Sequence, residues 1–419
     1  MDTIIIRGGR PLKGEVAVSG AKNAALPILA STLLSAGENR IFNLPKVKDV
    51  ATIKQLLIHL GARVDEEAGV MSVRMENLKH SEASYELVKT MRASVLVLGP
   101  LAARFGEVQV SLPGGCAIGA RPINLHLMGL EKMGAQVKID HGYVTVKTSR
   151  LKGAKIYLDL PTVTGTENLM MAATLADGTT VIENAAREPE VVDLASFLIK
   201  RGARIHGAGT DIVTIEGVDR LNSGDHTVMP DRIEAGTYLV ATAMTGGEVM
   251  VKDCSPHHLD ALLSKLQEAG VECVSYPNGI RILSSRGIRS VDVKTSPYPG
   301  FPTDMQAQMM ALMSISEGLS VITETVFENR FTHVAELRRM GADIKIEANS
   351  AIIKGVRRLS GAPVMASDLR ASACLVLAGL AAEGETAISR VYHLDRGYER
   401  MEEKFFALGA QIRRMKEAG

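Results

Sequence analysis

A cysteine inside a glycine-rich stretch is the residue of this sequence best placed to do chemistry. Cys116 follows Gly114 and Gly115, precedes Gly119 and lies five residues before Arg121. Glycine reaches backbone conformations that a β-carbon forbids, so such a stretch can fold over a ligand and carry the thiol with it. A nearby cation lowers the pKa of a thiol and raises its reactivity. The alternative is that Cys116 packs as a small hydrophobic residue, as most free cysteines do.

Polar clusters stand at or just before the start of six apolar segments that we expect to be buried helices. In chain order they are Lys22 with Asn23, Arg92, Glu167 with Asn168, Arg232 with Glu234, Asp304, and Asp368 with Arg370. The start of a helix favours acidic side chains, because its free N–H groups carry partial positive charge. Lys22, Arg92 and Arg370 oppose this rule. Three cations at matching positions favour a shared anion site over three unconnected exposed side chains.

A second loop associated with each apolar segment carries further candidates. These are Lys48, Cys116 with Arg121, Arg187, His257, Arg330 and Arg396. If the loops face one cleft, their cations converge there. Asp304 would lie among them as a carboxylate able to accept a proton. The alternative for Asp304 is a helix cap.

The chain repeats itself six times. A glycine, followed in five copies by alanine and in the fourth by Val271, precedes a short strand at each of six positions: Gly61, Gly134, Gly202, Gly270, Gly341 and Gly409. Their spacings are 73, 68, 68, 71 and 68 residues. Helices commonly end with a left-handed residue, which explains the glycine. Even spacing of this kind is the signature of a repeated structural unit.

Each repeat contains an apolar helix, a strand, a polar loop, an amphipathic helix and a strand hairpin, which predicts an α/β class. A helix that is apolar nearly all round must be buried, and one small unit cannot cover it. We therefore expect three units to gather with helices inside and sheets outside, giving two inside-out α/β domains. The predicted boundaries are 20–229 for the first domain, which carries the Cys116 loop, and 1–19 with 230–419 for the second. The active site is expected between them.

Composition excludes several classes of protein. The 419 residues contain 48 Lys+Arg and 47 Asp+Glu, which argues against nucleic-acid binding driven by bulk charge. Aromatic residues are 4% and tryptophan is absent, which disfavours base-stacking surfaces. The four cysteines lack metal-ligand spacing. Neither a signal peptide nor a run of about 18 apolar residues is evident, so we expect a cytoplasmic protein with no membrane contact and no metal.

Six segments together resemble the UDP-N-acetylglucosamine 1-carboxyvinyltransferases, a family of enolpyruvyl transferases, over nearly the whole chain. They are Ser19–Ala24, Pro113–Gly119 with Arg121 and Pro122, Gly165–Asn168, Pro230–Glu234, Pro302–Asp304 and Phe327–Phe331. The resemblance implies transfer of enolpyruvate from phosphoenolpyruvate to the 3′-hydroxyl of UDP-N-acetylglucosamine with release of phosphate, the first committed step of bacterial peptidoglycan synthesis. It implies roles in cell wall biogenesis, cell shape and division, and no cofactor or obligate protein partner.

The same resemblance assigns residues to roles. Lys22, Arg121 and Arg396 are similar to phosphate binders, whereas Arg330 and Arg370 are similar to carboxylate or cleft contacts. Cys116 matches the proton donor, the target of fosfomycin, which can also hold a pyruvate adduct as a thioether. Asp304 matches the general base near the 3′-hydroxyl. The substrate contacts implied are Asn23, Arg92, Arg121, Pro122, Ile123, Asn124, Leu125 and Val326. Many members have Asp at the position of Asn124, whose amide oxygen can still accept a hydrogen bond from uracil.

Two other functions compete with this interpretation. A shikimate-3-phosphate enolpyruvyl transferase shares the fold and the donor but needs no loop cysteine. A non-catalytic repeat scaffold needs neither that thiol nor basic residues at successive helix starts.

Overall fold

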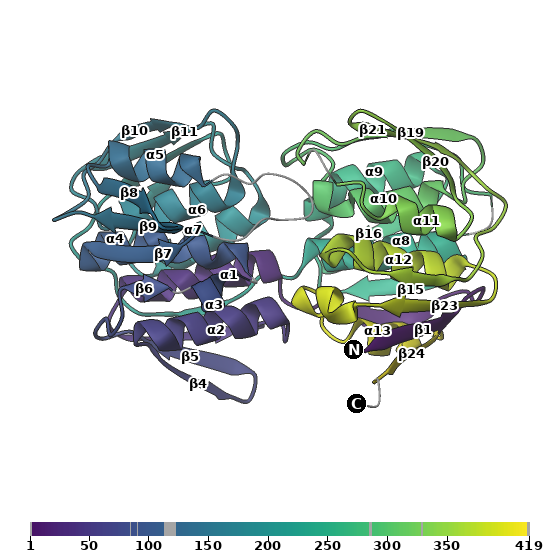
Figure 1. Cartoon of the computed structure of the whole chain (residues 1–419), viewed down its shortest axis with the longest axis horizontal. Coiled ribbons are helices and arrows are strands. Elements are labelled where there is room, and N and C mark those ends of the chain that lie inside the picture. The colour runs from purple at the N-terminus through teal and green to yellow at the C-terminus, as the bar shows by residue number, and fades with distance from the viewer. Residues whose placement is uncertain are drawn as a thin grey trace. The chain divides into compact units, whose positions relative to one another are not determined.

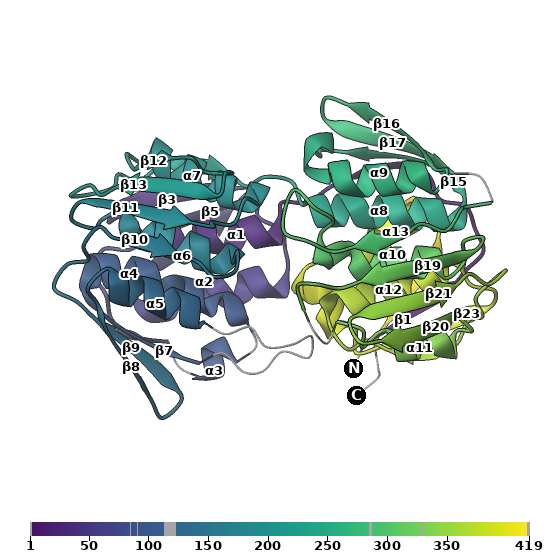
Figure 2. The same ribbon diagram turned by 90° about the horizontal axis from the view of Figure 1, so that it is seen from above.

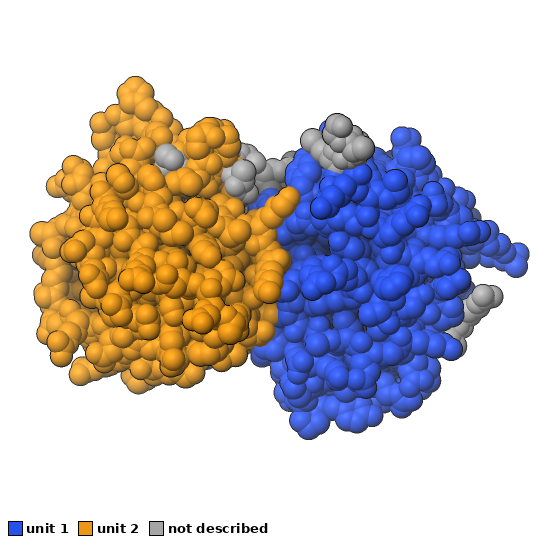
Figure 3. Space-filling view, turned by 90° about the horizontal axis from the view of Figure 1, so that it is seen from below, with its two compact units in different colours: residues 1–19, 116–120, 230–419 blue, residues 20–115, 121–229 orange. Residues whose placement is uncertain are grey.

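The computed structural model describes residues 2–83, 85–89, 91–112, 123–284, 287–327 and 330–416. They form two compact units, coloured separately in Figure 3. Of the described residues, those within 2–19 and 230–416 form unit 1, and those within 20–112 and 123–229 form unit 2. The chain therefore leaves unit 1 after Ser19 and returns at Pro230.

Each unit contains three four-stranded sheets, and all six sheets share one strand pattern. An edge strand pairs parallel with its neighbour, and the two remaining strands continue the sheet with antiparallel pairing. This shared pattern is the structural form of the sequence repeat.

In unit 2 the sheets are β14 (Asp225–Thr227), β3 (Glu38–Phe42), β5 (Val70–Arg74), β4 (Arg63–Glu67); β6 (Glu82–Ala83), β7 (Glu107–Ser111), β9 (Tyr143–Lys147), β8 (Gln136–Asp140); and β10 (Lys155–Tyr157), β11 (Thr179–Glu183), β13 (Ile212–Glu216), β12 (Arg204–His206). In unit 1 they are β2 (Lys13–Ala17), β15 (Gly247–Lys252), β17 (Gly279–Ser284), β16 (Glu272–Tyr276); β18 (Val293–Lys294), β19 (Leu319–Thr323), β21 (Ser350–Lys354), β20 (Asp343–Glu347); and β22 (Pro363–Met365), β23 (Glu385–Ser389), β1 (Thr3–Arg7), β24 (Gln411–Met415).

Within each unit three apolar helices lie inside and the sheets lie outside (Figures 1 and 2). The inner helices are α1 (Lys22–Ser31), α4 (Leu98–Phe105) and α6 (Val163–Ala173) in unit 2, and α8 (Arg232–Thr245), α10 (Gln306–Met313) and α12 (Leu369–Ala381) in unit 1. Every residue of α8 from Arg232 to Met244 is buried, and so is every residue of α10. The expected inside-out α/β fold is confirmed.

Amphipathic helices accompany the sheets, each burying one face: α2 (Lys48–Leu60), α5 (Asn124–Lys132), α7 (Pro189–Lys200), α9 (Asp260–Glu268), α11 (Val334–Arg339) and α13 (Met401–Ala407). Shorter helical segments are α3 (Tyr85–Val88) and the 3₁₀ turns η1 (Thr32–Leu34), η2 (Arg92–Val97), η3 (Pro256–Leu259), η4 (Thr303–Met305) and η5 (Val391–Arg396). No helix of the described residues is long and apolar enough to cross a membrane.

The second inner helix does not begin as an α-helix at the polar residue Arg92. Residues from Arg92 to Val97 form the 3₁₀ turn η2, and the α-helix begins only at Leu98. Pro100 lies in the first turn of this α-helix, where a proline removes no helical hydrogen bond because the first N–H groups have no partner within the helix.

The first strand of the chain completes the last repeat. β1 lies between β23 and β24 and pairs antiparallel with both, over Ile4–Arg7 with β23 and Thr3–Arg7 with β24. It takes the place that the second hairpin strand occupies in the other repeats. Ile4 and Ile6 point into the core with no exposed surface. The sixth repeat is therefore built from both ends of the chain.

All six repeat glycines adopt a positive φ, as the helix-ending pattern predicts. The angles are 115° at Gly61, 87° at Gly134, 102° at Gly202, 91° at Gly270, 94° at Gly341 and 92° at Gly409. At Gly341 a β-carbon would meet nothing within 4 Å. The requirement for glycine there comes from the backbone conformation and not from lack of space.

Gly341→Ala tests this explanation of the repeat. We expect it to lower the free energy of unfolding by about 1–2 kcal/mol, the usual cost of left-handed backbone for a residue with a β-carbon. Gly341→Asn should cost less, because asparagine tolerates this region better. Urea unfolding of both variants measures the difference. Equal stability of Gly341→Ala and the parent chain would contradict the backbone explanation.

Candidate active site

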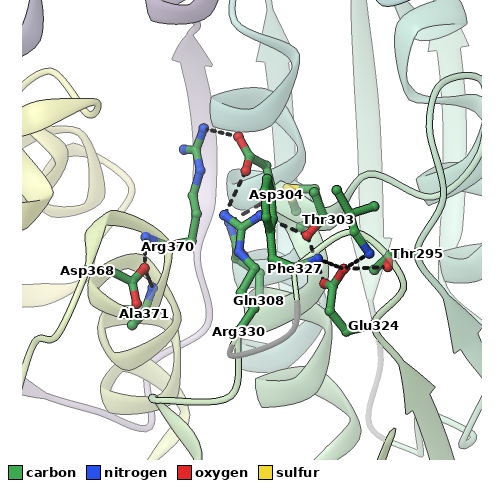
Figure 4. Close-up of polar contacts among 12 residues, drawn as sticks. Thr295, Thr303, Asp304, Gln308, Glu324, Phe327, Arg330, Asp368, Arg370 and Ala371 are labelled. Carbon is green, nitrogen blue, oxygen red and sulfur yellow. Dashed lines mark hydrogen bonds and ion pairs between the residues drawn. The ribbon is translucent and has the colours of Figure 1, made fainter. Parts of the chain in front are cut away.

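Two arginines and one aspartate form an ion-pair cluster in unit 1 (Figure 4). Arg330 Nη2 lies 2.7 Å from one carboxylate oxygen of Asp304, and Arg370 Nη2 lies 2.8 Å from the other. The side chains of Arg330 and Arg370 are 5% and 4% exposed, and that of Asp304 is 24% exposed. Three predicted site residues therefore meet, and the carboxylate is the member that solvent reaches.

The cluster fixes the charge of Asp304. Burial alone would raise the pKa of the carboxyl group, because burial disfavours the charged form. The positive charges of Arg370 and Arg330, together with their hydrogen bonds, outweigh burial and hold the pKa of Asp304 well below its usual value. In turn, Asp304 raises the pKa of Arg370 in spite of that residue's burial. All three groups are charged near neutral pH.

A helix cap explains how Arg370 can stand at a helix start. Asp368 precedes α12, and its Oδ1 accepts hydrogen bonds from the backbone N–H groups of Arg370 and Ala371 at 2.9 and 3.0 Å. The acidic neighbour satisfies amides that a helix leaves unpaired. Arg370 is therefore free to extend from the first turn toward Asp304 (Figure 4). Asp304 itself is not the cap of its turn, since its carboxylate receives the two arginines.

Aromatic rings and a hydroxyl support the two guanidinium groups. Arg330 Nη1 donates to Thr303 Oγ1 at 2.8 Å, and the group lies 5.3 Å from the ring centre of Phe327. Arg370 lies 5.4 Å from the ring centre of Tyr398. Nε of each arginine is buried without a hydrogen-bond partner among the described residues. The Nε–H group of each arginine is therefore a donor that the ion pair with Asp304 does not use.

In unit 2 the predicted cations also stand at helix starts. Lys22 is the first residue of α1, and its Nζ lies 3.3 Å from Asp49 Oδ2 in the first turn of α2. Asn23 follows Lys22 and is partly buried, and Arg92 is the partly buried first residue of η2. The repeat therefore brings these three residues to equivalent ends of neighbouring inner helices.

Glu167 does not stand at the start of its inner helix as expected: it is the fifth residue of α6. It is 1% exposed. Burial, with smaller contributions from the charges of Glu190 and Glu188, raises its pKa well above the usual value. Burial therefore favours the neutral form of Glu167 over the anion, a preference that the sequence pattern could not show.

The other predicted site residues are distributed over both units. Ile123 precedes α5, and Asn124 and Leu125 form its first turn. Val326 follows β19 and is 38% exposed, and Arg396 ends η5. Cys116, Arg121 and Pro122 lie outside the described residues.

His126 is a structural residue of this region that sequence reasoning missed. It follows Leu125 in α5 and is 3% exposed. Its Nε2 lies 3.3 Å from Thr164 Oγ1, and its Nδ1 lies 3.1 Å from Asn168 Nδ2. Burial lowers the pKa of His126 to about 4. The neutral ring therefore ties the first turn of α5 to the start of α6.

Among the described residues no group of three or more His, Cys, Asp or Glu side chains could hold a metal ion. Unit 1 offers a carboxylate held between two guanidinium groups. Unit 2 offers an ammonium group and a guanidinium group at helix starts, Lys22 and Arg92.

Comparison with solved structures defines the fold. Over 99% of both chains, the protein superposes with a TM-score of 0.89 on the enolpyruvyl transferase NikO from Streptomyces tendae, at 24% sequence identity. EPSP synthase from Acinetobacter baumannii gives a TM-score of 0.78 at 17% identity, covering 99% of this chain and 100% of that one. The fold is that of the enolpyruvyl transferases.

Sequence comparison identifies the branch. A family model described as EPSP synthase (3-phosphoshikimate 1-carboxyvinyltransferase) matches residues 6–405. The UDP-N-acetylglucosamine 1-carboxyvinyltransferase of Desulfatibacillum aliphaticivorans is 61% identical over 416 residues, covering 99% of this chain and 100% of the relative. That of Geotalea uraniireducens is 60% identical over 417 residues and covers both chains completely. The chain belongs to the UDP-N-acetylglucosamine 1-carboxyvinyltransferase family, as its sequence motifs predict.

Asp304→Asn tests the charge pairing in the cluster. A carboxyl group whose pKa is lowered by folding contributes stability above its unfolded pKa, about 3.9, and loses it as the pH falls. We expect Asp304→Asn to destabilise the protein most near pH 7 and progressively less below about pH 4. Urea unfolding at both pH values measures this, with Asp292→Asn as the control at an exposed aspartate of the same unit. A loss of equal size at both pH values would show that the charge is not what matters.

Proposed function

We propose that this protein transfers enolpyruvate from phosphoenolpyruvate to the 3′-hydroxyl of UDP-N-acetylglucosamine and releases phosphate. The placement of Asp304 between Arg330 and Arg370 carries the proposal, because it combines a carboxylate with buried cations. Phosphoenolpyruvate bears a phosphate and a carboxylate, so its site needs several positive groups. The names of relatives at 60% identity and above support the choice of acceptor.

The reaction proceeds by addition and then elimination. The 3′-oxygen of the sugar bonds to C2 of phosphoenolpyruvate while Asp304 takes the hydroxyl proton and Cys116 delivers a proton to C3. The C2–O bond to phosphate then breaks and a proton leaves C3, which restores the C2–C3 double bond and gives the enol ether product. Lys22, Arg121 and Arg396 bind the phosphate group, which leaves as a stabilised anion.

The arginine cluster explains how Asp304 gains basicity when the substrate binds. While both arginines hold it, its low pKa makes it a weak base. The carboxylate of phosphoenolpyruvate competes with Asp304 for the guanidinium groups of Arg330 and Arg370. Each arginine that turns toward the ligand raises the pKa of Asp304. The base is therefore strongest when its substrate is in place.

The uridine part is bound by Arg121, Pro122, Ile123, Asn124 and Leu125, and the sugar lies near Asn23, Arg92 and Val326. We place the enzyme in the cytoplasm, at the first committed step of peptidoglycan synthesis, where its product serves cell wall growth, cell shape and division. No cofactor is required for this chemistry, because the donor already carries the activated enol.

A phosphate-release assay tests the proposal. The purified protein should release phosphate from phosphoenolpyruvate only when UDP-N-acetylglucosamine is present, since the acceptor hydroxyl starts the addition step. Parallel reactions with shikimate 3-phosphate test the alternative acceptor, which the description of the matching family model names. Turnover with shikimate 3-phosphate and none with the sugar nucleotide would overturn the assignment.

Selective labelling tests the role of Cys116. We expect a small phosphonate epoxide such as fosfomycin to modify Cys116 alone and to stop turnover, because the phosphonate binds where the substrate phosphate does. Cys254 and Cys273 are poor competitors, since burial raises their pKa values to about 11 and about 12, and burial also raises the pKa of Cys374. Mass spectrometry of the labelled peptides identifies the site.

Replacement of the thiol separates its two roles. Cys116→Ser should be unlabelled and nearly inactive, because a hydroxyl is a far weaker acid. Cys116→Asp should be unlabelled yet active, because a desolvated carboxylic acid can also deliver a proton. Labelling at another cysteine, or full turnover by Cys116→Ser, would remove the thiol from the mechanism.

A further inference from the structure

We propose that Glu324 is a positioning residue that holds Arg330 in its place against Asp304. This inference rests on the proposed function and concerns the same site. Glu324 follows β19 and is 2% exposed. Its carboxylate accepts four hydrogen bonds, from Thr295 Oγ1, Thr303 Oγ1 and the backbone N–H groups of Val326 and Phe327, at 2.8, 2.8, 2.7 and 3.2 Å.

None of these four donors is charged. A buried carboxylate that serves only stability normally sits beside a cation, because burial of an unpaired charge is costly. The cation linked to Glu324 is Arg330, and it is reached through one hydroxyl: Arg330 Nη1 donates to Thr303 Oγ1, which donates to Glu324 Oε2. The carboxylate of Glu324 therefore acts on Arg330 through the Thr303 hydroxyl.

This chain of hydrogen bonds has a fixed direction. A guanidinium group can only donate, so Thr303 must accept from Arg330 and direct its single hydroxyl proton elsewhere. Glu324 can only accept when ionised, so it receives that proton. The carboxylate thus orients the Thr303 hydroxyl with its lone pair toward Arg330 (Figure 4). A neutral amide in place of Glu324 would lose this preference.

The second support of Arg330 also depends on Glu324. The carboxylate accepts the N–H groups of Val326 and Phe327, which fixes the turn that follows β19. That turn carries the Phe327 ring, which lies 5.3 Å from the Arg330 guanidinium. The two groups that support Arg330, the Thr303 hydroxyl and the Phe327 ring, are therefore both positioned by the buried carboxylate of Glu324.

Arg330 in turn shares Asp304 with Arg370, so a displaced Arg330 leaves the base with a single, asymmetric partner. Catalysis is sensitive to such shifts, because a misplacement of about 1 Å can cost on the order of 100-fold in rate. Glu324 does not need to touch a substrate to have this effect. It acts through Thr303 and Phe327.

The experiment compares turnover of the full-length protein carrying Glu324→Gln, Thr303→Val or both changes. We expect each single variant to lower kcat roughly 10-fold to 100-fold. The kcat of the double variant should lie no more than about twofold below that of the less active single variant, because both changes break the same chain of hydrogen bonds. Thr303→Ser should restore turnover, since serine keeps the hydroxyl. Multiplied losses in the double variant, or normal turnover in Glu324→Gln, would overturn the proposal.

Matched controls separate position from stability. Thr323→Val removes a hydroxyl of the same strand that pairs with Ser350 at 3.0 Å, and Glu336→Gln removes a carboxylate of the same unit that accepts the Met365 N–H at 3.2 Å. Both should keep near-normal turnover. If Glu324→Gln fails to fold, the contrast between Thr303→Val and Thr303→Ser decides. Equal activity of these two would overturn the proposal, whereas an inactive parent chain would contradict only the proposed function.

Discussion

A helix that is apolar on every side must be enclosed, and this requirement organises both units. Residues of α8 and α10 are buried all round. A single sheet has one inner face and covers only part of such a helix. Three repeats that turn their helices inward enclose those helices together, and each sheet then covers a part of the shared core. The sequence repeat is the consequence, since each of the two units must cover three such helices.

The same enclosure decides where polar chemistry can stand. The sides of an inner helix belong to the core, where polar residues such as Thr237 and Gln308 hydrogen-bond to one another, whereas a charged side chain reaches the edge of the core where the helix begins. Lys22, Arg92 and Arg370 occupy such starts, and Asp304 lies in the 3₁₀ turn before α10. These side chains remain close to buried surface, which strengthens the charge interactions that each makes within its own unit. Strong pairing, such as that of Asp304 with its two arginines, is the result of placing charge at the edge of a dry core.

The sequence predicts the repeated pattern well because that pattern is local. The glycine after each amphipathic helix has a positive φ in all six copies, and that single residue is enough to predict a left-handed helix end. The apolar inner helices are equally visible. The start of α4 was less predictable, because the apolar pattern runs without a break through the 3₁₀ turn that precedes the α-helix. The positions of Asp304, Arg330 and Arg370 follow from the repeat, but their mutual hydrogen bonds do not, because these join residues 26 and 66 positions apart in the chain. Glu324 and His126 were missed because each is an ordinary residue whose importance lies in hydrogen bonds to other segments, at Thr295 and Thr303 for Glu324 and at Thr164 and Asn168 for His126.

The last repeat shows why the core of unit 1 depends on the two ends of the chain. Among the described residues, β24 pairs with β1 and not with β23, so the first strand links β24 to the rest of that sheet. The Tyr398 hydroxyl, on the segment that leads to α13, shares hydrogen bonds with Thr237 of α8 and Gln308 of α10. The Tyr398 ring also lies against Arg370. The repeat that the N-terminal strand completes therefore carries both Arg370 and the tyrosine that links α8 to α10.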